Sequence, residues 1–168
     1  MKFSPKYKMP FKRRREGKTD YKQRLKLLKS GKPRLVVRRS LKYITAQIAE
    51  FDKKGDKILA SATSKELKKL GWNFACDNLP AAYLTGLLIG KRSLEKNITE
   101  AVLNSGLYPS VKGSRIYAVV KGAKDAGLNV PVDEEMFPSD ERIRGQHIEK
   151  FKNLPLEFEK IKEKIIGE

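Results

Sequence analysis

The chain of 168 residues and 19.1 kDa suits one domain with tails better than two domains. With 39% hydrophobic and 34% charged residues, a globular part of roughly 120–130 residues can bury a core without disulfide bonds. The formal net charge is +17 at pH 7, so a polyanionic partner is favoured. The single cysteine, Cys76, excludes an internal disulfide and a cysteine cluster for zinc.

The positive charge is concentrated in residues 1–40, which hold sixteen Lys and Arg side chains against two acidic ones, a net charge of +14. The other 128 residues carry the remaining +3. Such an arm suits nucleic acid, because each neutralised phosphate releases condensed counterions. A membrane surface would also attract it, but Lys12–Arg15 lies among Pro and polar residues without an amphipathic apolar face. Nucleic acid is therefore the favoured partner.

The sequence gives no indication of a membrane protein or of a metal-dependent protein. No apolar stretch follows the N-terminal basic residues, so we expect no signal peptide and a cytoplasmic protein. The longest apolar run, around residues 84–89, is far shorter than the ~20 residues that span a bilayer. His147 is the single histidine, and a Cys/His metal site is not expected. We expect no cofactor and no small-molecule substrate.

Residues 1–30 form the predicted basic arm. Alone they bury too little apolar surface to order themselves, apart from a short helix over Tyr21–Leu28. Arginine guanidinium groups bind phosphate oxygens bidentately, so Lys12, Arg13, Arg14 and Arg15 are candidate RNA contacts. The interleaved aromatic rings Phe3, Tyr7 and Phe11 could stack on unpaired bases. A targeting signal or solubility tail is the alternative, although a solubility tail would not need the rings.

An antiparallel meander is predicted after the arm, within an α/β domain over residues 31–130. Arg34–Ser40 is rich in β-branched residues, and Tyr43–Glu50 alternates with Ile44, Ala46 and Ile48 on one face. A tight turn near Leu41 joins these two strands. A third strand over Lys57–Ala62 follows a turn at residues 53–56.

The period then changes to helical. Ser64–Leu70 is a predicted short helix with Ser64 as a possible cap. Asp77 or Asn78 caps a longer helix that has Pro80 in its first turn and runs to about Asn97. Residues 99–104 form a predicted short buried strand. The order of elements indicates a mixed sheet.

The C-terminal third begins with a helix that starts at Ser114 and ends near Gly127, with inward-facing residues Ile116, Val119, Val120 and Ala123. Residues 131–168 form a predicted extension. It consists of an acidic loop over Pro131–Pro138 and surface helices over residues 139–150 and 155–166, where Lys and Glu alternate.

Two further clusters are candidate RNA contacts. Basic and aromatic side chains gather at the start of the sheet, where Arg34 and Arg38 share one face of a strand; the members are Arg34, Arg38, Arg39, Lys42 and Tyr43. The segment Lys112-Gly113-Ser114-Arg115 offers free amides and a helix dipole to a phosphate. An ordinary solvated sheet face and a merely well-capped helix are the respective alternatives.

Enzymatic readings fail on spacing and composition. Gly86–Lys91 has three residues between its glycines and is followed by Arg92, whereas a Walker loop needs four residues and then a Ser or Thr. A metal-dependent nuclease needs paired carboxylates on adjacent strands. The first predicted strand has none and the second has only Glu50 at its end. We expect no enzymatic activity.

Several separate motifs, in the same order, resemble the family of large-subunit ribosomal protein eighteen over roughly residues 20–150. They are Gly31–Ser40, Lys42–Ile48, Pro80–Lys91, Gly113–Gly127 and Asp140–Gly145. Phe137-Pro138 and the C-terminal tail are similar to archaeal rather than bacterial members. The resemblance implies a three-layer α/β/α fold with a mixed sheet, of the ribonuclease-H-like type used without catalysis.

The resemblance also implies the partners. Members bind 5S rRNA and hold it on the central protuberance, beside neighbouring large-subunit ribosomal proteins, while the arm reaches 23S rRNA. The implied rRNA-binding residues are Lys12, Arg13, Arg14, Arg15, Tyr21, Arg24, Arg34, Arg38, Arg39, Ser40, Lys42, Tyr43, Lys112, Gly113, Ser114 and Arg115. Two alternatives remain: a general structured-RNA-binding module outside the ribosome, and a protein-interaction scaffold built on the acidic loop and C-terminal helices.

Overall fold

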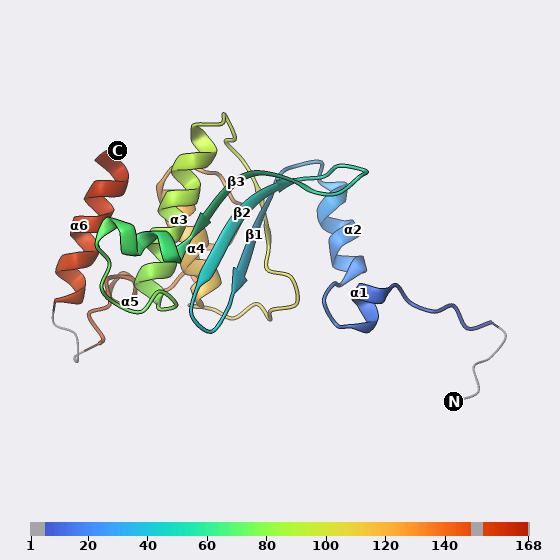
Figure 1. The fold of residues 1–168 in the computed structure, drawn as a ribbon, viewed down its shortest axis with the longest axis horizontal. Helices are drawn as coiled ribbons and strands as arrows, with labels where there is room; N and C mark the ends of the chain where they lie inside the picture. The colour runs from blue at the N-terminus through green and yellow to red at the C-terminus, as the bar shows by residue number, and fades with distance from the viewer. Residues whose placement is uncertain (1–5, 149–152, 168) are drawn as a thin grey trace.

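A computed structural model describes residues 6–148 and 153–167, and its centre is a four-stranded mixed sheet in the order β3-β2-β1-β4 (Figure 1). Strands β1 (Arg34–Arg39), β2 (Ile44–Glu50) and β3 (Lys57–Thr63) form an antiparallel meander. Strand β4 (Val102–Asn104) runs parallel to β1. The predicted meander and mixed sheet are confirmed.

Strand β4 is shorter than the predicted strand over residues 99–104. The first residues of the predicted strand pair with Asn129 and not with β1. Asn129 N donates to Thr99 O at 2.8 Å, and Ala101 N donates to Asn129 O at 3.0 Å. Only residues 102–104 lie in register with β1.

The short helix η1 (Ser64–Leu70) is a 3-10 helix that Thr63 caps, so the predicted cap at Ser64 is wrong. Thr63 and Glu66 form a capping box, in which Thr63 N donates to Glu66 Oε1 at 2.8 Å. The buried Ser64 hydroxyl instead accepts a hydrogen bond from Ile44 N at 2.9 Å. It therefore joins η1 to the start of β2.

Helices α3 (Leu79–Leu94) and α4 (Arg115–Asp125) cover one face of the sheet. Of the two predicted caps for α3, Asn78 is the one used, and its Oδ1 accepts from Ala81 N at 2.9 Å. The helix ends three residues before the predicted Asn97, which has a left-handed φ of 58°. The predicted start of α4 at Ser114 is confirmed.

Glycines hold these two helices close together. A Cβ built on Gly86 would lie 2.1 Å from Val119 O, and one on Gly122 would lie 2.2 Å from Tyr83 O. Backbone therefore packs directly on backbone where α3 meets α4. The glycine spacing that superficially suggested a phosphate loop serves helix packing.

The C-terminal helices depart from the prediction of two surface helices. Helix α5 (Asp140–Arg144) has five residues, because Gly145 takes a left-handed φ of 76° and ends it; residues 149–150 of the predicted helix lie outside the described range. Helix α6 (Leu154–Gly167) packs on α3 and buries an apolar stripe of Leu154, Phe158, Ile161 and Ile165 in the core. It is therefore part of the folded domain, and its Lys and Glu residues occupy the outward positions.

The three predicted layers are unequal. Helices α3 and α4 cover one face of the sheet and α6 packs on α3, whereas the arm and the loop after β4 lie against the opposite face (Figure 1). The arm contains α1 (Lys12–Arg15), α2 (Tyr21–Lys29) and the short link between them, and neither helix buries a residue. Within the described part of the chain, no helix is long and apolar enough to cross a membrane.

Candidate nucleic-acid interface

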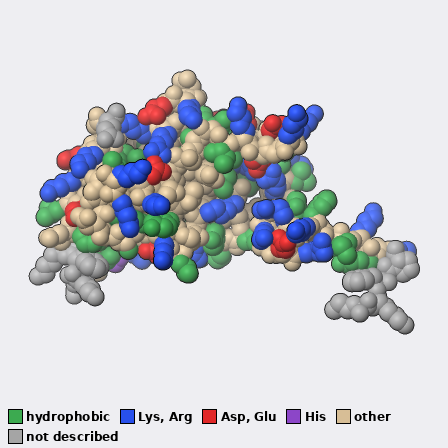
Figure 2. Space-filling model, in the orientation of Figure 1, with side chains coloured by type: hydrophobic (Ala, Val, Ile, Leu, Met, Phe, Trp, Pro, Cys, Tyr) green, Lys and Arg blue, Asp and Glu red, His purple; other side chains and the backbone are tan. Residues whose placement is uncertain are grey.

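The arm presents its cations to solvent. Lys12, Arg13, Arg14 and Arg15 are all exposed on α1, and Figure 2 shows Lys and Arg side chains along the arm and over the visible face of the domain. Lys12 has only a loose ion pair with Glu16 at 3.9 Å, and such exposed pairs contribute little. These cations are accessible to RNA phosphates.

An arginine–aspartate–arginine junction fastens α2 to the sheet. Arg24 donates bidentately to Asp56, with Nη1 2.9 Å from Oδ2 and Nη2 2.8 Å from Oδ1. Arg34 Nη2 lies 2.8 Å from the same Oδ1 as an ion pair without hydrogen-bond alignment. Hydrogen bonding from Arg24, supported by Arg34, lowers the pKa of Asp56.

This junction changes the role of two candidate RNA contacts. The Arg34 side chain is only 1% exposed, so its guanidinium cannot meet an RNA phosphate in this conformation. The Arg24 guanidinium is occupied by the Asp56 carboxylate. Tyr21 is the first residue of α2, and the centre of its ring lies 5.1 Å from the centre of the Phe11 ring. All three residues organise the base of the arm.

Arg38 lies on the same face of β1 as Arg34, the face on the side of the arm, as the strand alternation predicts. Its Nη1 donates to Val37 O and to Asn104 O, both at 2.8 Å, and its Nη2 donates to Asn104 Oδ1 at 3.3 Å. A Cβ on Gly106 would lie 2.9 Å from Arg38 Cζ. The guanidinium is therefore fixed against the loop after β4, and desolvation lowers its pKa.

The turn between β1 and β2 contains both residues that hold the structure and a residue that is accessible to RNA. Ser40 Oγ accepts from Tyr43 N at 2.9 Å and thereby shapes the turn. Tyr43 is half-buried and packs against the core. Lys42 is exposed and has no ion pair among the described residues, beside Leu41, which is 95% exposed. Lys42 is the member of this cluster that is most open to RNA.

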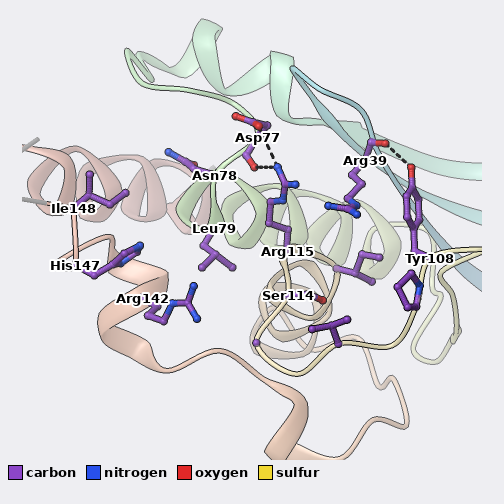
Figure 3. A pocket seen from close by; sticks show the side chains of 14 residues that line it. Arg39, Asp77, Asn78, Leu79, Tyr108, Ser114, Arg115, Arg142, His147 and Ile148 are labelled. Atoms are coloured by element: carbon purple, nitrogen blue, oxygen red, sulfur yellow. Dashed lines mark hydrogen bonds and ion pairs between the residues drawn. The ribbon is translucent and has the colours of Figure 1, made fainter. Parts of the chain in front are cut away.

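Four sequence-predicted residues meet at one cavity of about 540 Å³, here called the α4 groove (Figure 3). They are Arg39, Gly113, Ser114 and Arg115, and the groove's other polar and aromatic side chains are Asp77, Asn78, Tyr108, Arg142 and His147. Lys112 does not line it; it pairs at 3.4 Å with Glu135 of the acidic loop. The groove therefore brings the end of β1 together with the start of α4.

Hydrogen bonds and ring contacts hold the walls of the α4 groove. Arg115 Nη1 donates to Asp77 O at 2.7 Å and to Asp77 Oδ2 at 3.0 Å. Tyr108 Oη donates to Arg39 O at 2.7 Å, and the Arg39 guanidinium lies 4.8 Å from the centre of the Tyr108 ring. Figure 3 shows this pair on one side of the groove and Arg142 with His147 on the other.

Sequence reasoning missed Tyr108, Arg142 and His147 as members of this site. Arg142 falls in the motif Asp140–Gly145, which carries the family resemblance but no local pattern of a binding residue. Tyr108 and His147 lie in segments without a local signature, and only the fold brings them beside Ser114.

The acidic loop is partly neutralised by the chain's own lysines. Glu134 lies 3.6 Å from Lys124, Glu135 pairs with Lys112, and Asp140 just beyond the loop pairs with Lys121. These carboxylates are highly exposed, so the pairs are weak.

Residues 5–102 match a family model described as "Ribosomal large subunit proteins 60S L5, and 50S L18". The matched range covers more than half of the 168 residues. The chain belongs to this ribosomal protein family. It is also 52% identical over 151 residues to the large ribosomal subunit protein uL18 of the archaeon Methanococcus maripaludis, an alignment that covers 90% of this chain and 78% of the relative.

Family membership confirms the resemblance found in the sequence motifs. This L18-family chain is a protein of the large ribosomal subunit, and its place is therefore the ribosome. The match begins at residue 5 in the arm, includes β1, β2, β3 and α3, and ends at residue 102, the first residue of β4. Gly113, Ser114, Arg115 and Arg142 of the α4 groove lie beyond that range.

Proposed function

We propose that this L18-family protein binds 5S rRNA and attaches it to 23S rRNA, as a structural part of the central protuberance. The observation that carries the proposal is a division of charge within a ribosomal protein. The first 40 residues hold +14 of the total +17, and the nearly balanced remainder still supplies two of the three arginines that line the α4 groove. The strand order, with three antiparallel strands and a parallel fourth, supports the ribonuclease-H-like topology that the resemblance implies.

The arm and the domain have different tasks in this proposal. The exposed cations Lys12–Arg15 reach 23S rRNA, because an extended arm enters spaces between RNA helices that a rigid domain cannot. Lys42 and the α4 groove contact 5S rRNA from the folded domain. Arg24 and Arg34 act indirectly, since their shared Asp56 sets the direction in which the arm leaves the sheet.

Phosphate contacts supply most of the affinity, and the rigid groove supplies the discrimination of shape. If about eight phosphates are neutralised, the logarithm of the binding constant falls against the logarithm of salt concentration with a slope of roughly −6 to −7. A neighbouring ribosomal protein is the expected further partner, because the central protuberance holds several.

Truncation of the arm tests this division of labour. Removal of residues 1–18 takes away eight Lys and Arg side chains but keeps Asp20, whose Oδ1 caps α2 by accepting from Lys22 N at 2.8 Å. We expect a smaller salt slope and weaker binding to 23S rRNA fragments, with the domain still folded by circular dichroism and the preference for 5S rRNA retained. An unfolded truncated chain, or one that loses its 5S preference, would contradict the proposal.

A further inference from the structure

The α4 groove has the size of a site for a single small unit rather than for a helix. Its volume of about 540 Å³ falls within the roughly 300–1,000 Å³ of ligand sites in proteins. Its walls come from four separate segments: the end of β1, the start of α3, the start of α4 with the loop before it, and α5 with the residues that follow it. Rigid elements therefore surround it, and the inference below rests on the proposed function in taking RNA as the partner.

The groove holds two cations without an acidic partner. Asp77 binds Arg115 and so neutralises one of the three arginines. Within residues 6–148 and 153–167, no carboxylate lies within ion-pair distance of Arg39 or Arg142. Because each unpaired guanidinium offers a fork of donors to an oxyanion, the groove is prepared for one anionic group.

The start of α4 adds uncompensated donors at the same place. Ser114 is the N-cap but makes no capping hydrogen bond, and its Oγ is buried without a partner among the described residues. The first intrahelical bond is made by Ala118 N, so the amides of residues 115–117 have no acceptor within the helix. Arg142 Nη1 lies 3.8 Å from the Cβ position of Gly113, which places its charge beside these amides. A phosphate matches this set of donors.

An aromatic ring with a fixed orientation lines the opposite side of the groove. The hydroxyl of Tyr108 is held by Arg39 O and its ring lies beneath the Arg39 guanidinium. Leu79 and Ile116 add apolar wall to the groove. Rings of this kind stack on unpaired bases in single-stranded and looped RNA, whereas the bases of a duplex are already stacked and inaccessible.

We propose that the α4 groove holds one unpaired nucleotide of the bound rRNA. Its phosphate lies at the start of α4, where it accepts from the free amides of residues 115–117 and from Arg142, and its base lies against Tyr108. The protein thus recognises a looped or bulged position in the RNA, in addition to the duplex backbone that the arm and Lys42 contact.

Two variants test the proposal with full-length protein and 5S rRNA. Tyr108→Ala removes the stacking surface and Arg142→Gln removes the phosphate contact, and each is expected to weaken binding about tenfold. Tyr108→Phe keeps the ring and is expected to bind within about threefold of wild type. Lys65→Gln removes the same charge as Arg142→Gln from an exposed site on η1 and should change affinity by less than about twofold.

Nucleotide-resolution footprinting of the complexes identifies the position. We expect one unpaired nucleotide that wild type protects to regain its reactivity with Tyr108→Ala and with Arg142→Gln, while the other protections persist. Far-ultraviolet circular dichroism of each variant separates a binding defect from unfolding. Footprints and affinities equal to those of wild type would overturn the proposal and leave the groove to an acidic segment of a neighbouring protein. Failure of wild type to prefer 5S rRNA would instead overturn the proposed function.

Discussion

Substitution of Gly86 by alanine tests how closely α3 and α4 pack. A Cβ at this position would lie 2.1 Å from Val119 O, 2.9 Å from Val119 C and 3.0 Å from Val119 Cα. All three are backbone atoms, so no side-chain rotation relieves the overlap. The two helices must move apart by roughly 1 Å to restore ordinary contact, and the interface at Gly122 must open with them.

The expected cost combines two opposing effects. Overpacking a tight core costs about 1–3 kcal/mol and occasionally more, and a backbone-to-backbone clash belongs at the upper end of that range. Replacing glycine by alanine inside a helix stabilises the helix by about 1 kcal/mol, which offsets part of this cost. We therefore expect Gly86→Ala to lower the free energy of unfolding by about 2 kcal/mol.

Urea denaturation followed by circular dichroism measures this difference. The matched control is Gly167→Ala, the same substitution in helix α6 at a position where no atom lies within 4 Å of the new Cβ. We expect the control to unfold at the wild-type midpoint or slightly above it. A Gly86→Ala protein at least as stable as wild type would refute the close packing of α3 on α4.

Two further predictions concern the sheet junction and the cysteine. Asp56 has a lowered pKa, so its ionised form stabilises the fold fully above the ordinary aspartate pKa of 3.8. This contribution is lost as pH falls through the folded-state pKa. Asp56→Asn leaves the Arg34 guanidinium buried without its carboxylate and should lower the free energy of unfolding by about 2 kcal/mol at pH 7. The difference from wild type should shrink below about pH 4, where Asp56 itself becomes protonated. A difference independent of pH would contradict this. Burial raises the pKa of Cys76, so its thiol should react with a disulfide reagent much more slowly in the native protein than in urea, and equal rates would place it at the surface.

Much of the fold follows from local patterns in the sequence. The alternation of Ile44, Ala46 and Ile48 identifies β2, since side chains two apart share a face. Asn78 and Pro80 identify the start of α3, because both satisfy helix-start chemistry that depends only on neighbouring residues. The cap of η1 was missed by one residue, as Thr63 and Ser64 are chemically alike and only the pairing with β2 separates them.

The burial of Arg34 and the packing of α6 could not be predicted in the same way. Arg34 is buried because Asp56, in a distant turn, and Arg24, in the arm, meet it across the sheet. Helix α6 has Lys and Glu at every turn, and its narrow apolar stripe becomes meaningful only against α3.

The candidate site could likewise be predicted only in part from the sequence. The basic residues could be named from composition, but their accessibility depends on tertiary contacts that no local pattern contains. Arg39 and Ser114 thus remain candidate contacts, Arg24 and Arg34 become structural, and Tyr108 and Arg142 enter the site only through the fold.

The most direct test of 5S rRNA binding is a mobility-shift titration of the full chain. It compares archaeal 5S rRNA with tRNA, at a low and a high salt concentration, because salt removes the non-specific phosphate contribution. We predict that 5S rRNA is preferred at least about a hundredfold at the higher salt, since a shaped site persists when charge is screened. Equal binding to both RNAs, lost together as salt rises, would contradict the proposal and leave only a basic arm.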